Sequence, residues 1–151
     1  MSGLPAPTPA GFLDFLRNVV GIPVLALPDS APVINVAYSL ALVLVNPLAA
    51  AINTTLYALM VYNLGTANII SFAPDQVGFT TFADLRMKFG MGGSFQPGII
   101  QSTSDSGTSS SFMIPDALKS LTIADLRLLK TPWGQAYLAL AQQFGTDWGV
   151  T

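Results

Sequence analysis

The sequence predicts a mainly α-helical protein, a single helical bundle with a long central helical hairpin and one extended β-hairpin or loop excursion. Three observations lead to this prediction. Residues 30–74 contain no charged side chain, and Pro47 divides them into two halves of helical length. A threonine followed by proline, a favoured helix start, occurs at residues 8–9 and again at residues 131–132. Only residues 98–114 are rich in serine and threonine without a helical pattern.

The charge-free stretch must avoid water in lipid, in its own core or against other subunits. A membrane span needs about 20 apolar residues, and the run of residues 36–45 is shorter and ends at Asn46-Pro47. Asn35, Ser39 and Asn46 fall within roughly 40° of one another on a helix, and such a polar seam is typical of a crowded bundle or a subunit contact. We therefore predict a buried helical hairpin, with a two-span membrane hairpin as the alternative.

Composition indicates one domain whose surface is covered by partners. The chain has 151 residues, which is one domain of ordinary size, here residues 1–151. It is 51% hydrophobic and only 9% charged, whereas soluble domains carry about 25% charged residues. Obligate oligomers with core-like interfaces account for such a composition. The net charge of −2 gives no general affinity for nucleic acid.

The first 21 residues predict an extended arm followed by an amphipathic helix. Residues 1–8 are small and rich in proline, which predicts an extended N-terminal arm. Thr8 caps the helix that follows, and Gly21 ends it. One side of this helix is expected to be apolar, formed by Phe12, Leu13, Phe15, Leu16, Val19 and Val20.

A short helix capped by Thr80 or Thr81 comes after the central hairpin. Its apolar side carries Phe82, Leu85 and Phe89, while Asp84, Arg86 and Lys88 are expected to face water.

Residues 98–114 then predict a β-hairpin with a three-residue turn at Asp105-Ser106-Gly107. A serine-rich linker without β-structure is the alternative.

The last helix begins at Thr131-Pro132 and carries an aromatic stripe. Trp133, Tyr137, Leu140 and Phe144 lie at i, i+4, i+7 and i+11, a spacing typical of a core-facing side. Truncation of Trp133 to alanine is then expected to cost roughly 3–5 kcal/mol. Residues 146–151 form a C-terminal tail, in which Trp148 either anchors in a partner's groove or folds back on its own bundle.

The sequence shows few signals of an enzyme. The chain has no histidine and no cysteine, which excludes histidine-dependent nucleophiles, thiol catalysis and the usual zinc sites. Asp105 lies among Ser102, Ser104 and Ser106, but these are the default residues of turns. We predict a protein that is not an enzyme, with no catalytic residue, no metal and no cofactor.

Two segments of the C-terminal half carry a family resemblance. One runs from Ile99 to Phe112, and the other from Leu128 to Leu138 includes Thr131-Pro132-Trp133-Gly134. Together with residues 27–30 and 57–64, they resemble the head–tail connector proteins of tailed bacteriophages, also called adaptor or head-completion proteins. In that family a Ser/Gly-rich excursion precedes a last helix that opens with Thr-Pro-aromatic-Gly.

The resemblance implies a structural virion protein that forms a ring, typically of twelve subunits. Such a ring joins the portal to the tail, lies at the neck of the particle and surrounds the channel through which DNA passes as cargo. The implied partners are further copies of the chain, the portal protein and a tail or nozzle protein, with no membrane. Before assembly the protein would lie in the host cytoplasm.

Two sets of residues follow from these expectations. Contacts with neighbouring subunits or the portal are expected at Gln101, Ser104, Asp105, Ser109, Phe112, Asp147 and Trp148. The structural motif of the last helix is Thr131, Pro132, Trp133, Gly134 and Tyr137. The alternatives are another phage structural protein, for capsid decoration or tail completion, and a small two-span membrane protein of the holin type.

Overall fold

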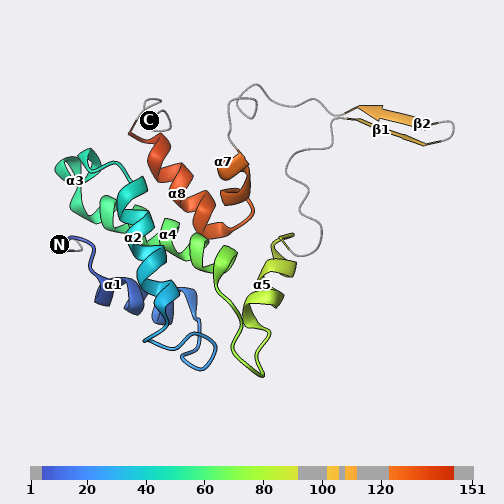
Figure 1. The fold of residues 1–151 in the computed structure, drawn as a ribbon. Helices are drawn as coiled ribbons and strands as arrows, with labels where there is room; N and C mark the ends of the chain where they lie inside the picture. The colour runs from blue at the N-terminus through green and yellow to red at the C-terminus, as the bar shows by residue number, and fades with distance from the viewer. Residues whose placement is uncertain (1–4, 92–101, 106–107, 112–122, 145–151) are drawn as a thin grey trace.

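The computed structural model describes residues 5–91, 102–105, 108–111 and 123–144 (Figure 1). Within them the chain is mainly helical, as predicted. The helices are α1 (Pro9–Asp14), the π-helix η1 (Phe15–Val20), α2 (Pro32–Leu44), α3 (Leu48–Ile52), α4 (Thr54–Phe72), α5 (Thr81–Lys88), α7 (Ile123–Leu128) and α8 (Pro132–Gln142). Two short strands, β1 (Ser102–Asp105) and β2 (Thr108–Ser111), complete the described elements.

Helix α4 is the centre of the bundle. It contacts η1, α2, α3, α5 and α8, and Figure 1 shows it running behind α2 toward the side of α5 and α8. Every residue from Met60 to Ile70 is buried, so this part of the helix has no solvent-facing side. A helix that is buried all round is a core helix. No helix in the described part of the chain is long and apolar enough to cross a membrane.

An aromatic cluster joins α1 to α2 and α4. The fully buried Phe12 ring lies between Tyr38 and Tyr62, with centroid distances of 5.8 and 5.9 Å. On the α4 side the ring rests on Gly65, where an added Cβ would lie 2.8 Å from the nearest ring atom. Because Gly65 has no side chain, α1 can approach the core helix α4 this closely.

Burial raises the pKa of Tyr38 above its ordinary value, and the neighbouring Tyr62 and Tyr57 raise it further.

The ends of the first helical segment follow the prediction, whereas its course does not. Thr8 accepts a hydrogen bond from the Gly11 backbone N–H, and Gly21 ends the segment in a left-handed conformation with φ of 83°. From Phe15 onward the helix widens, because the backbone N–H of Gly21 bonds to the carbonyl of Leu16, five residues back. The wider helix rotates the side chains of its last residues relative to an ordinary α-helix. Val19 is 65% exposed, so the prediction that it belongs to the apolar inner side is wrong.

A short extra helix separates the two long ones. The chain breaks at Pro47 as expected, but α3 forms between α2 and α4, so the connection is more than a simple turn. Asn46 accepts a hydrogen bond from the Leu48 N–H at 3.0 Å and so begins α3. Asn53 accepts hydrogen bonds from the N–H groups of Thr55 and Leu56 and caps α4, which begins at Thr54.

Helix α5 is held by contacts that local sequence does not reveal. Its first N–H groups, those of Phe82 and Ala83, donate to the carboxylate of Asp75 at 2.7 and 3.0 Å. Thr80 occupies the N-cap position, but its side chain bonds to Asp84 instead. The prediction that Arg86 faces water is wrong, because its guanidinium donates to the carbonyls of Ile70 and Ala73 at the end of α4.

The strands pair antiparallel, with Ser102 opposite Ser111 and Asp105 opposite Thr108. Asp105 is thus the last residue of β1, and the prediction that it opens a three-residue turn is wrong. The remaining residues of the 98–114 segment lie outside the described part of the chain.

Candidate assembly surface

Helix α2 has two apolar sides. The inner side, with Ile34, Ala37, Tyr38 and Ala41, is buried, and the helix packs against α4. The outer side carries Val36, Leu40 and Val43 at i, i+4 and i+7, so these residues form one stripe along the helix. All three are exposed, Val43 to 79%.

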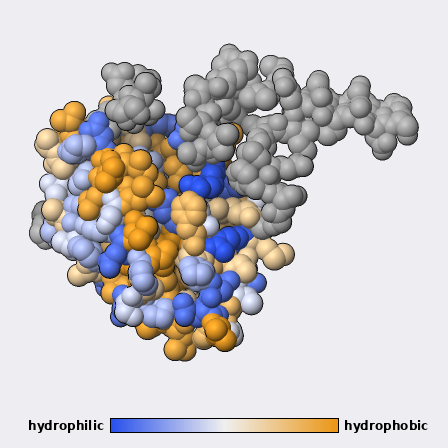
Figure 2. Space-filling model, viewed as in Figure 1, coloured by the Kyte–Doolittle hydropathy of each residue, from blue (hydrophilic) through white to orange (hydrophobic). Residues whose placement is uncertain are grey.

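Exposed aliphatic side chains also occur at the end of α2 and on α3. We define the α2–α3 face as the exposed residues Val36, Leu40, Val43, Leu44, Leu48 and Ile52, each between 40% and 79% exposed. Figure 2 shows hydrophobic surface where α2 and α3 lie. All six side chains are aliphatic, and each is exposed over at least 40% of its surface. These residues are the candidate assembly surface of the described part of the chain.

No charged residue belongs to the helices that form this face. Residues 30–74 are free of charge, and within them the exposed Asn35 and Ser39 lie beside the stripe on α2. The polar seam predicted from the sequence therefore borders the α2–α3 face at these two positions and does not face the bundle. A partner that covers the face would have no ion there to desolvate.

A second exposed apolar feature lies in the turn that precedes α2. Val24 and Leu25 are exposed, Leu25 to 71%, whereas their neighbours Ile22, Ala26 and Leu27 are buried. The N–H groups of Ala26 and Leu27 both donate to the carbonyl of Pro23 at 3.1 Å. We call Val24 and Leu25 the apolar tip.

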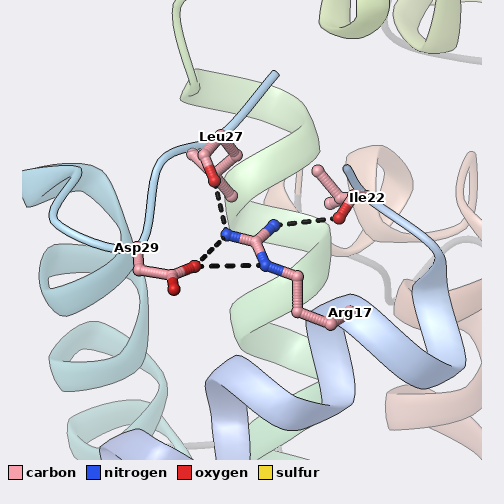
Figure 3. A network of polar contacts seen from close by, with 4 residues as sticks. All are labelled: Arg17, Ile22, Leu27 and Asp29. Carbon is pink, nitrogen blue, oxygen red and sulfur yellow. Dashed lines mark hydrogen bonds and ion pairs between the residues drawn. The ribbon is translucent and has the colours of Figure 1, made fainter. Parts of the chain in front are cut away.

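Arg17 holds the turn that carries the tip (Figure 3). Its guanidinium donates to the carbonyls of Ile22 at 2.9 Å and Leu27 at 2.5 Å, on the two sides of the tip. It also forms an ion pair with Asp29 at 2.5 Å. Two backbone contacts and one carboxylate fix the turn to η1, so Val24 and Leu25 are presented in one position.

Other exposed apolar residues lie around α5. They include Phe72 at the end of α4, Val77 and Phe79 in the following loop, and Met87 on α5. The Arg127 guanidinium lies 4.7 Å from the centre of the Phe72 ring, which pairs this ring with a cation from α7. This region differs from the α2–α3 face because it carries the charged residues of α5.

The interface residues expected from the sequence are only partly described. Ser104 pairs with Ser109, and Asp105 with Thr108, in the β1–β2 ladder. Gln101, Phe112, Asp147 and Trp148 lie outside the described residues. Within the described ranges no three acidic side chains gather in a group that could hold a metal ion.

The Thr-Pro-aromatic-Gly motif has a structural explanation. The buried Thr131 caps α8 by accepting a hydrogen bond from the Gly134 N–H at 3.0 Å, and Pro132 is the first residue of the helix. A Cβ on Gly134 would overlap the backbone carbonyl of Leu128, so the glycine lets α8 cross the end of α7 closely. Tyr137 packs against the core with its ring partly buried, and burial raises its pKa.

Trp133 does not belong to the core, which corrects the expectation from its stripe. It is only partly buried and meets Phe89 edge-on, with centroids 5.9 Å apart. We expect Trp133→Ala to lower the free energy of unfolding by about 1–2 kcal/mol, the range of one aromatic contact with partial burial. Urea denaturation measures this value, and a loss of 4 kcal/mol or more, as estimated from cavity formation, would contradict the peripheral position.

Comparison with family models, with curated proteins and with solved structures finds no match for this chain in any of the three. The α2–α3 face and the apolar tip were not among the residues predicted from the sequence. The spacing of Val36, Leu40 and Val43 could have indicated the face, but the equally apolar inner side of the same helix obscures it.

Proposed function

We propose that this chain is a structural subunit of a virion that assembles with copies of itself into a ring, and that the ring is a head–tail connector. The observation that supports self-assembly most directly is the α2–α3 face. Its six aliphatic side chains are each 40% to 79% exposed, and a stable protein–protein interface buries roughly 800 Å² on each partner. Covering these side chains with a neighbouring subunit would remove them from water.

The composition supports a permanent interface over a transient one. Only 9% of the residues are charged, and depletion of charge is the mark of the buried centre of an interface. A permanently assembled subunit also needs fewer charges for solubility, because less of its surface meets water.

The connector assignment comes from the sequence resemblance. In this proposal about twelve subunits form a ring between the portal and a tail or nozzle protein, at the neck of the particle. DNA passes through the ring as cargo, and a slightly acidic chain suits a channel wall that does not retain it.

The finer architecture belongs to the same proposal. The charge-free segment acts as a long central hairpin, and residues 98–114 act as an arm that reaches a neighbouring subunit. An isolated two-stranded hairpin is marginally stable in water, and β1–β2 contains only Ser, Thr and Asp. Addition of a strand from a neighbouring subunit would extend this sheet.

Light scattering coupled to size-exclusion chromatography tests self-assembly on protein purified without detergent. We expect a discrete oligomer with a mass several times 15.9 kDa, visible as a ring by electron microscopy and able to bind a portal ring. A monomer at all concentrations would contradict the proposal. Recovery of the protein only from membranes would instead favour the two-span alternative.

A further inference from the structure

We propose that copies of this chain associate head to tail, with the apolar tip of one copy packed on the α2–α3 face of the next. The inference rests on the proposed self-assembly and adds the two surfaces that meet. Both surfaces are apolar, both are exposed, and they lie on different elements of the same fold.

The tip lies before the first residue of α2, whereas the α2–α3 face runs along the helix from Val36 and ends on α3. Val24 and Leu25 precede the first residue of this helix, whereas Val43 and Leu44 are near its end and α3 follows. With 13 residues, α2 is about 20 Å long, and Figure 1 shows α3 at the end away from the turn. An interface between two different surfaces of the same chain is heterologous, and repetition of it produces a ring when the rotation closes.

The tip is suited to docking because it is already ordered. Arg17 binds the carbonyls on both sides of it, so association does not have to restrict a mobile loop. Preorganisation of this kind lowers the entropic cost of binding. Leu25 and Val24 can enter an apolar surface while Arg17 stays bound to the turn.

The charges near the tip are compatible with an uncharged face. Arg17 is largely buried and is neutralised by Asp29, so the tip brings no unpaired cation to the interface. The α2–α3 face contains no ion that would require an opposite charge from a partner. A second copy of the chain suits such a face because its tip is also uncharged. Each copy has one tip and one face, so the two surfaces are present in equal number.

Two charged variants test the arrangement by complementation. Leu25→Lys disables the tip and Val43→Lys disables the face, and both side chains are exposed, so the monomer fold is expected to persist. We expect each variant alone to lose the oligomer and run at the 15.9 kDa mass of one chain. An equimolar mixture is expected to form a dimer of twice that mass, because the intact face of one variant receives the intact tip of the other.

Met87→Lys is the matched control, since it places the same charge on another exposed apolar residue of a helix. We expect it to assemble like the unmodified chain. Circular dichroism melting verifies that each variant is folded.

Three outcomes would overturn the head-to-tail arrangement. If Leu25→Lys forms dimers alone while Val43→Lys does not, the face pairs with itself. If both variants assemble like the unmodified chain, other surfaces form the contact, and self-assembly itself still stands. If the unmodified chain is a monomer, the proposed function fails together with this inference.

Disulfide cross-linking is a second test, and its variants introduce no charged side chain into the interface. The chain contains no cysteine, so Leu25→Cys and Ile52→Cys each introduce a single thiol. Oxidation of their mixture is expected to yield a disulfide-linked dimer of the two variants, in excess over dimers from either variant alone. Equal yields from the mixture and from Ile52→Cys alone would show that the face meets itself.

Discussion

Replacement of Phe12 by alanine is expected to lower the free energy of unfolding by about 3–5 kcal/mol, as measured for large aromatic side chains in cores. The ring is fully buried and stacks on both Tyr38 and Tyr62, so its removal leaves a cavity at the junction of α1, α2 and α4. For a domain of this size such a loss lowers the melting temperature by about 10 °C. Chemical denaturation and thermal melting both measure it. A change below 1 kcal/mol would contradict the central position of the ring.

Gly65 provides an internal control for this prediction. In the unmodified protein Gly65→Ala is expected to be destabilising, because the new Cβ would lie within 3 Å of the Phe12 ring. In the Phe12→Ala background the same change is expected to be stabilising by up to about 1 kcal/mol, since alanine is the better helix former. The double-mutant cycle therefore reports the contact as a reversal of sign. Equal effects in both backgrounds would show that the ring does not rest on this glycine.

Replacement of Gly134 by alanine is the second change with a large expected effect. Helix propensity alone would make the substitution stabilising by about 1 kcal/mol. The structure predicts the opposite, a loss of about 3 kcal/mol, because the Cβ would overlap the Leu128 carbonyl, which is backbone and cannot rotate away. Denaturation by urea decides between the two signs. Gln142→Ala, at an exposed position of the same helix, is the matched control and is expected to change stability by less than about 0.5 kcal/mol.

Helix boundaries were largely predictable from short-range sequence signals. Thr8-Pro9 and Thr131-Pro132 each start a helix because the threonine hydroxyl accepts an N–H of the first turn and the proline has no N–H to leave unpaired. At the start of α4 the Asn53 side-chain oxygen accepts N–H groups of the first turn in the same way, without a proline after it. These contacts join residues two or three positions apart, so they can be recognised from the sequence without knowledge of the fold.

Contacts between distant residues could not be predicted in this way. Asp75 caps α5 from seven and eight residues before the N–H groups that it accepts, and Arg86 reaches back 16 residues to the carbonyl of Ile70. The widening of the helix after Phe15 depends on the carbonyl of Leu16 and the left-handed Gly21. No periodicity argument distinguishes this course from an ordinary α-helix.

The apolar character of the α2–α3 face was predictable from the sequence, but the residues that form it were not. The absence of charge in residues 30–74 indicated that this segment is apolar throughout and led to the prediction of a buried hairpin. It could not show which residues the bundle itself covers, because α2 is apolar on both sides. Packing against α4 buries Tyr38 and Ala41 and leaves Leu40 and Val43 outside.

In the proposed assembly, the absence of charged residues from the α2–α3 face determines how association responds to solvent and temperature. Apolar contact is driven near 25 °C by the entropy of released water, and this driving force weakens on cooling. Subunits joined through this face would therefore separate more readily in the cold than at growth temperature. Screening by simple salt would change little, because the helices that form the face carry no ion to screen. Sulfate, which is excluded from protein surfaces, would strengthen the association.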